Sequence, residues 1–163
     1  MQSRFLLCGG SFVLACTWIL AHGNEPRQAK LEVQGGQITI DYSAPTLQGR
    51  DLNELIKLPG ANPWRLGADR PTQLSTPVSL KFGDSPVPAG RYRLRAYLDG
   101  DGNWWLQAYD SSRAIVGKIQ LSSSTAETSE EHLLISLHGT SGAATIQVQW
   151  GKNLLQGQFA VAP

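Results

Sequence analysis

Hydrophobic and polar residues alternate through most of the chain, and this period of two predicts β-strands. The clearest case is residues 91–98, where three arginines alternate with apolar side chains. A shift of one residue in register would bury all three arginines, so the face that each side chain takes is firmly set. Weaker alternation or a short apolar run marks further expected strands at residues 31–33, 37–42, 78–82, 104–109, 114–121, 133–137, 146–150 and 158–162.

Turn-forming and polar residues separate these segments. Gly35-Gly36 and Asp99-Gly100-Asp101-Gly102 are each expected to form a tight hairpin turn. Residues 122–131 are polar and predict a mobile loop. Residues 51–56 predict one short helix, with Asp51 as its N-cap and Glu54 as the capping-box partner. Eight or nine short strands with one short helix indicate a mostly β fold, either an antiparallel β-sandwich or an open barrel.

The longest part of the chain without a strand pattern contains the sequence Trp64-Arg65-Leu66-Gly67-Ala68-Asp69. A loop held by a sheet is a common place for a binding site. The candidate ligand-binding residues are Arg50, Trp64, Arg65, Asp69 and Arg70. Arginine has a planar fork that suits carboxylates and phosphates, and tryptophan can stack on a sugar ring or a cation, so the ligand would be a small anion or a carbohydrate.

A structural role is the alternative for the same loop, and it is the one that we expect. Trp64 would then plug the end of the sandwich, and Arg65 would be buried against a carboxylate such as Asp41 or Asp69. A second aromatic pair, Trp104 and Trp105, lies on one expected strand. Adjacent side chains on a strand point to opposite faces, so one should be in the core and the other at the surface or under a loop.

Residues 1–23 resemble a secretory leader, with Arg4 at the start, an apolar stretch over 5–20, and Ala21-His22-Gly23 as a cleavage site. We therefore expect residues 24–30 to form a tether and residues 31–163 to form a single β-rich domain. The expected location is extracytoplasmic, in the periplasm or secreted, with no transmembrane span in the mature chain. An uncleaved anchor and a lipoprotein attached through Cys16 are the two alternatives.

Removal of the leader changes which kinds of chemistry are available. Cys8 and Cys16 both lie within it, so the mature chain has no thiol for a disulfide, a nucleophile or a zinc–thiolate site. Without Arg4, the fourteen basic residues become thirteen, which equals the number of acidic residues. A net charge of zero and no long block of one sign argue against nucleic acid as a partner. A small ligand, a carbohydrate or a protein remains as the partner.

Neither the acidic residues nor the histidines form a convincing metal site. Asp99, Asp101, Asn103 and Asp110 have the spacing of an EF-hand calcium loop, but Trp104 occupies the position of its glycine. We therefore expect a hairpin turn there, independent of calcium. His132 and His138 are roughly 20 Å apart on one strand and cannot share a metal.

No Gly-x-Ser-x-Gly motif and no glycine-rich phosphate loop is present, so we assign no catalytic residue, no metal ligand and no cofactor. The expected function is a non-enzymatic binding or interaction module. The alternative is a hydrolase or another enzyme with its site at the Trp64–Asp69 loop.

Several of these residues also form a set of motifs with characteristic spacing. The motifs are Asp41-Tyr42-Ser43-Ala44-Pro45, Gly49-Arg50, the Trp64–Asp69 sequence, Thr72 and Pro88-Ala89-Gly90-Arg91-Tyr92-Arg93-Leu94. With them the chain, from about Leu31 onward, resembles a bacterial secreted family known as domain of unknown function 2911. Ala44 and Asp69 depart from the arginine and asparagine that are usual in that family. The resemblance implies an extracytoplasmic β-rich domain and no established activity.

Overall fold

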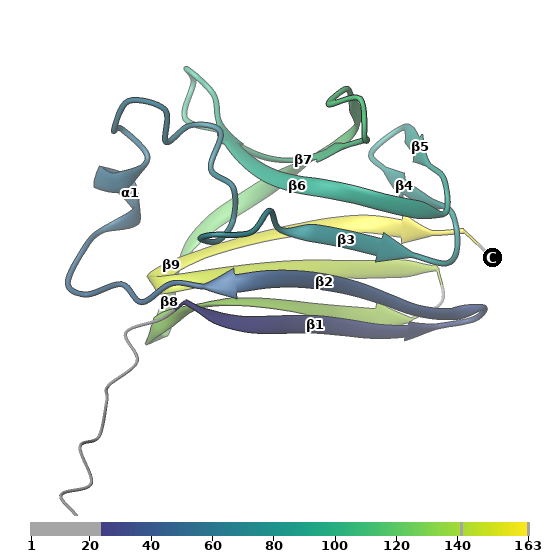
Figure 1. Cartoon of the computed structure of the whole chain (residues 1–163), viewed down its shortest axis with the longest axis horizontal. Coiled ribbons are helices and arrows are strands. Elements are labelled where there is room, and N and C mark those ends of the chain that lie inside the picture. The colour runs from purple at the N-terminus through teal and green to yellow at the C-terminus, as the bar shows by residue number, and fades with distance from the viewer. Residues whose placement is uncertain (1–23, 141, 163) are drawn as a thin grey trace, which may run out of the picture.

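The computed structural model describes residues 24–140 and 142–162, and it confirms the mostly β architecture. Within these residues nine strands form one open antiparallel sheet in the order β1-β2-β3-β6-β7-β8-β9-β4-β5 (Figure 1). The strands are β1 (Glu25–Val33), β2 (Gly36–Ala44), β3 (Gln73–Thr76), β4 (Leu80–Phe82), β5 (Ser85–Val87), β6 (Gly90–Leu98), β7 (Trp104–Tyr109), β8 (Ile115–Thr140) and β9 (Ala143–Val161). The one helix of the described chain is α1 (Leu52–Leu55).

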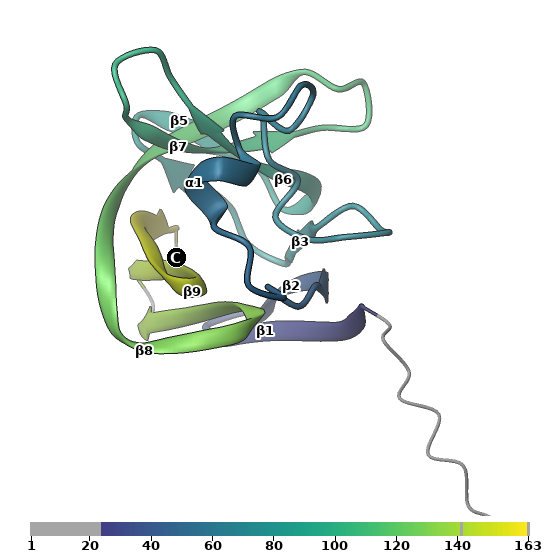
Figure 2. The same cartoon turned by 90° about the vertical axis from the view of Figure 1, so that its left-hand side faces the viewer.

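The sheet curls on itself because its two longest strands bend. The first part of β8 pairs with β7, and the rest pairs with β9. Figure 2 shows β8 passing round one side of the molecule from the level of β7 to the level of β1. The predicted mobile loop at 122–131 is therefore wrong, because these polar residues belong to β8. Ser122–Thr125 pair with Asn153–Gln156, and the register breaks between Thr125 and Leu134, where the strand bends.

The expected tether at 24–30 is also not a tether. Glu25–Lys30 form the first part of β1 and pair with Thr39–Ala44 of β2. Ala29 is the one residue of 25–30 whose side chain is buried. Backbone hydrogen bonds to β2, rather than an alternating apolar pattern, hold this segment, so the sequence pattern gave no sign of it. The Gly35-Gly36 turn follows at the expected place, since both glycines have positive φ angles.

The inner face of the curled sheet contains the hydrophobic core, and the register predicted for β6 is confirmed. Tyr92, Leu94 and Ala96 are buried, while the three arginines between and beside them are exposed. Trp104 is buried and Trp105 is partly exposed, as their adjacent positions predicted. The core is continuous from β1 to β9, so the described residues share one apolar interior.

The helix α1 lies across one end of the curled sheet (Figure 2). Asp51 caps it, since the Asn53 amide donates to the Asp51 carboxylate over 2.6 Å. The predicted capping box does not form, because the Glu54 carboxylate accepts from the Lys57 amine at 2.8 Å instead. In the part of the chain that the structure describes, no helix has the length and apolar character needed to cross a membrane.

Candidate functional site

A two-way backbone bridge to β6 helps to fix the segment with the candidate residues to the sheet. The Trp64 amide donates to the Ala96 carbonyl at 2.7 Å, and the Ala96 amide donates to the Trp64 carbonyl at 2.8 Å. The next residues turn toward β2, where the Ala68 amide donates to the Ser43 carbonyl. The loop therefore crosses from β6 to β2 over the end of the sheet that α1 also covers (Figure 1).

Buried contacts inside the loop explain part of its sequence. Leu66 is fully buried, and its carbonyl accepts a hydrogen bond from the Thr72 hydroxyl at 2.8 Å. A Cβ atom on Gly67 would lie 2.8 Å from the Ser43 carbonyl oxygen, closer than atoms can approach without a shift of the backbone. Glycine is therefore required where the loop passes β2. Leu66, Gly67 and Thr72 therefore have structural roles in holding the loop against the sheet.

Trp64 of the loop packs against two tryptophans of the sheet, Trp104 and Trp150. The Trp64 ring stacks on Trp150 with centroids 5.9 Å apart and planes at 11°. It meets Trp104 edge-on at 6.5 Å and 70°. Trp104 and Trp150 are buried, and Trp64 is half-buried. The Trp150 indole N–H is buried, and within residues 24–140 and 142–162 it has no hydrogen-bond partner. Buried donors of this kind in proteins are usually satisfied by ordered water or by a ligand.

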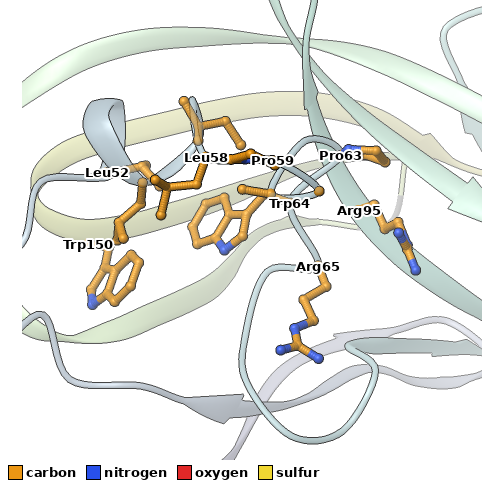
Figure 3. Close-up of a pocket in the computed structure, with 12 residues that line it drawn as sticks. Leu52, Leu58, Pro59, Pro63, Trp64, Arg65, Arg95 and Trp150 are labelled. Atoms are coloured by element: carbon orange, nitrogen blue, oxygen red, sulfur yellow. The ribbon is translucent and has the colours of Figure 1, made fainter.

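Trp64 and Trp150 form one wall of a cleft of about 470 Å³ between α1, the loop, β6 and β9. Most of the other walls are apolar and come from Leu52, Leu55, Ile56, Leu58, Pro59, Gly60, Ala61 and Pro63. The charged residues among those that line it are Arg65 and Arg95. Figure 3 shows both arginine side chains extending away from the Trp64–Trp150 pair. The cleft thus combines an apolar interior with two cationic groups.

Arg65 is not the buried structural arginine that we predicted. Its side chain is exposed and, within the described residues, forms no hydrogen bond and no ion pair. The two carboxylates proposed as its partners are taken by amides, since Asp41 accepts from Gln28 and Asp69 accepts from Asn24. The prediction was wrong because the Leu66 side chain, and not that of Arg65, points into the core. Arg65 therefore lies at the surface.

Arg50 is instead the arginine that is tied to loop carbonyls. Its guanidinium donates to the Leu47 carbonyl at 2.9 Å and to the Thr46 carbonyl at 2.7 Å. It also lies over the Trp150 ring, 5.8 Å from the centroid. Arg50 therefore contacts one wall residue of the cleft without lining the cleft itself. Trp64 packs on the core as predicted, but it also faces the cleft.

Asp69 and Arg70 do not join the cleft. Asp69 has a left-handed backbone and accepts from Asn24, at the start of β1. Arg70 lines a second hollow of about 460 Å³ together with Arg27 and Arg93. Of the five predicted site residues, Trp64 and Arg65 line the cleft and Arg50 packs against its wall. Asp69 and Arg70 lie outside the cleft.

Sequence reasoning missed Arg95 and Trp150 as members of the site. Arg95 was expected to face outward on its strand, and Trp150 was not among the candidate site residues. No pattern among the residues next to them in the sequence indicated that either one would lie beside Arg65. The bridge between Trp64 and Ala96 brings the loop next to Arg95, and this pairing between distant segments leaves no local pattern.

The acidic turn has its own internal contacts. The Asp99 carboxylate accepts from the Trp105 indole at 2.9 Å and from the Asn103 amide at 2.8 Å. The Trp105 hydrogen bond is the main reason why the pKa of Asp99 is below its ordinary value. Asp110 lies beyond the other end of β7 and closes a separate turn. In the described part of the chain no group of three or more histidines, cysteines or acids is placed to hold a metal.

Comparison with known proteins gives one match. A family model described as a protein of unknown function, DUF2911, matches residues 25–159, from the start of β1 to near the end of β9. Searches of curated proteins and of solved structures found no match.

Proposed function

The chain belongs to the DUF2911 family, and because the description of that family carries no activity, we propose a function from the cleft itself. We propose that the protein is a binding module for small amphipathic anions, which have an apolar body and one carboxylate, sulfate or phosphate group. The observation that carries this proposal is Arg65, an exposed arginine without a partner in the described chain, at a cleft walled by stacked tryptophans.

The composition of the cleft supports this class of ligand. Ligand pockets are mostly apolar, with a few polar groups that fix the orientation of the ligand. Here the leucines, prolines and tryptophans would receive the apolar body, and Arg65 and Arg95 would receive the anion. Arginine offers a fork of donors that fits two acceptor oxygens at once. An unpaired arginine needs no other bond to be broken before it binds.

The lining also favours binding over catalysis. An enzyme site needs a nucleophile or titratable groups that converge in one place. The residues that line the cleft are apolar or arginine, and none is an acid, a histidine, a lysine or a hydroxyl-bearing residue. Arginine stays protonated and cannot act as a general acid or base at ordinary pH. A binding role is thus the function that this set of side chains supports.

We further propose that this binding takes place outside the cytoplasm. The support is the leader-like sequence of residues 1–23 together with the start of β1. The strand begins at Glu25, so cleavage after Gly23 would take no residue from the sheet. A binding module of this kind would meet its ligand in the periplasm or the medium.

The proposal is tested by titrating the protein with decanoate and with decanol, which share an apolar chain and differ in charge. Tryptophan fluorescence reports binding, because Trp64 and Trp150 line the cleft. We expect decanoate to bind more tightly than decanol, and Arg65→Ala to weaken decanoate by about tenfold or more, the usual effect of losing a charged hydrogen bond.

Arg91→Ala is the matched control, because Arg91 is also an exposed arginine but does not line the cleft. It should leave decanoate affinity unchanged. Equal binding of decanoate and decanol, or equal loss in both variants, would contradict the proposed role of Arg65. No binding of either probe would contradict the ligand class.

A further inference from the structure

The outer face of the sheet at β6 carries a cluster of arginines, of which only Arg95 also lines the cleft. We call it the arginine face and define it by Arg70, Arg91, Arg93, Arg95 and Arg113. All five side chains are exposed. Among residues 24–140 and 142–162 none of them forms an ion pair or a hydrogen bond, and the one recorded contact is Arg95 over the Tyr109 ring at 6.0 Å. The fold itself therefore does not account for these charges.

Strand geometry concentrates this charge in a row. Residues two apart on a strand lie roughly 7 Å from each other on the same face, so Arg91, Arg93 and Arg95 repel one another. Asp41 is a carboxylate in the same hollow as Arg27, Arg70 and Arg93, where it accepts from Gln28 and forms no ion pair within the described residues. Asp69 accepts from Asn24 and Asp110 from its own turn. A chain whose acids and bases balance after the expected leader cleavage thus has a locally cationic face.

The shape of the face is elongated. Two hollows meet at Arg93, one of about 460 Å³ that also contains Arg27 and Arg70, and one of about 400 Å³ that also contains Arg95 and Arg113. A single small anion could occupy only one of the two hollows. A linear chain with repeated anionic groups could occupy both and contact arginines along its length.

The neighbours of the arginines indicate the chemistry of that chain. Gln73 stands opposite Arg93, and Ser75 stands opposite Arg91, on β3. Amide and hydroxyl groups between arginine forks suit a polymer that carries hydroxyls as well as carboxylates. Single-stranded nucleic acid would need free aromatic rings for base stacking. Tyr109 is already covered by Arg95 and donates its hydroxyl to Gln107, and Trp105 is covered by Lys118. Among the described residues this leaves Tyr97 as the one uncovered ring beside the arginines, too few for a run of stacked bases.

From this arrangement we infer that the arginine face binds an acidic polysaccharide, a linear glycan with a carboxylate on its repeating sugars. The site adjoins the cleft at Arg95 and extends away from it through Arg93, Arg70 and Arg113, and its ligand is a polymer rather than a small amphiphile. Electrostatic contacts of this kind weaken as salt rises, because salt screens the charges.

The experiment uses the mature chain and polygalacturonate as the probe, with neutral dextran beside it, by calorimetric titration at about 50 mM and about 300 mM salt. We expect polygalacturonate to bind, more weakly at the higher salt, and dextran not to bind. Replacing Arg70, Arg93 and Arg113 together by glutamine should weaken polygalacturonate at least tenfold. None of these three residues lines the cleft, so decanoate titration of the same variant should be unchanged and serves as its folding control.

The matched variant replaces Lys57, Lys81 and Lys152 by glutamine, which changes the net charge equally at exposed sites elsewhere. It should bind polygalacturonate like the parent protein, and so should Arg65→Ala. Equal losses in the lysine and arginine variants would overturn the inference, as would absence of polygalacturonate binding at low salt. Tighter binding of single-stranded DNA or of vesicles with anionic lipids than of polygalacturonate would also overturn it. Because the two sites use different probes and variants, failure at one leaves the result at the other readable.

Discussion

Arg50 and Arg65 lie in the same connection between β2 and β3, yet only Arg50 is held by the fold. Arg50 donates to two backbone carbonyls and covers Trp150. Arg65 is exposed at the cleft and has no partner within the described residues. Two arginines of the same connection therefore differ in role. The Arg50 side chain turns toward backbone carbonyls and is held by them, whereas the Arg65 side chain turns toward solvent at the cleft.

The two arginines should differ in their effect on stability. We expect Arg50→Ala to lower the free energy of unfolding by roughly 1–2 kcal/mol, because it removes two hydrogen bonds and a cation from an aromatic ring. Arg65→Ala should change it by less than about 0.5 kcal/mol, as for most exposed positions. Urea unfolding followed by tryptophan fluorescence measures both. A larger loss for Arg65→Ala than for Arg50→Ala would contradict this division.

At the scale of elements, the hairpin between β6 and β7 depends on one carboxylate. Asp99 accepts hydrogen bonds from the backbone amides of Asp101 and Asn103 and from the Trp105 indole. It thereby joins the turn to the first residues of the returning strand. These bonds are stronger to the ionised carboxylate, which is why they lower its pKa.

This hairpin should make stability sensitive to acid. Because the pKa of Asp99 is lower in the folded state than its unfolded value of about 3.9, the unfolded chain takes up the proton first as pH falls. The contribution of Asp99 is therefore present above that value and is lost as the pH falls through the folded pKa. Urea midpoints measured from about pH 6 to about pH 3 should fall less steeply in Asp99→Asn than in the parent protein.

Asp101→Asn is the control for that series. The Asp101 side chain lies in the same turn and, in the described chain, makes no hydrogen bond of its own, so its variant should follow the parent curve. Identical pH curves for the parent protein and Asp99→Asn would show that the hairpin does not depend on the carboxylate.

For the whole molecule, the first strand of the described chain, β1, begins at Glu25. We expect mass spectrometry of the exported protein to find a mature chain that begins near Asn24. That chain should melt well above a chain that begins at Leu31, by about 5 °C or more, because the shorter chain loses the pairing of 25–30 with β2. Equal melting temperatures would mean that this part of β1 adds nothing to the fold. A lipid-modified Cys16 would instead support the lipoprotein alternative.

The sequence pattern predicted what is set locally and failed where distant segments pair. Alternation on β6 and the two hairpin turns follow from neighbouring residues, so they were predictable. The middle of β8 is polar, and its strand character comes from β9, so it looked like a loop. For the site, the chemistry of Arg65 and Trp64 was visible, but their surroundings were not, because Arg95 and Trp150 come from β6 and β9.

An open sheet has two outer strands, and here these are β1 and β5. Exposed backbone groups on such strands can pair with another molecule, which is a common route to aggregation. Each of the two contains a proline, Pro26 in β1 and Pro86 in β5, and none of the other seven described strands contains one. Proline has no amide hydrogen to donate, and β5 is only three residues long. Each edge strand therefore has a gap in its row of backbone donors. Such gaps disfavour pairing of the edge strands with a second chain, although the sheet does not close.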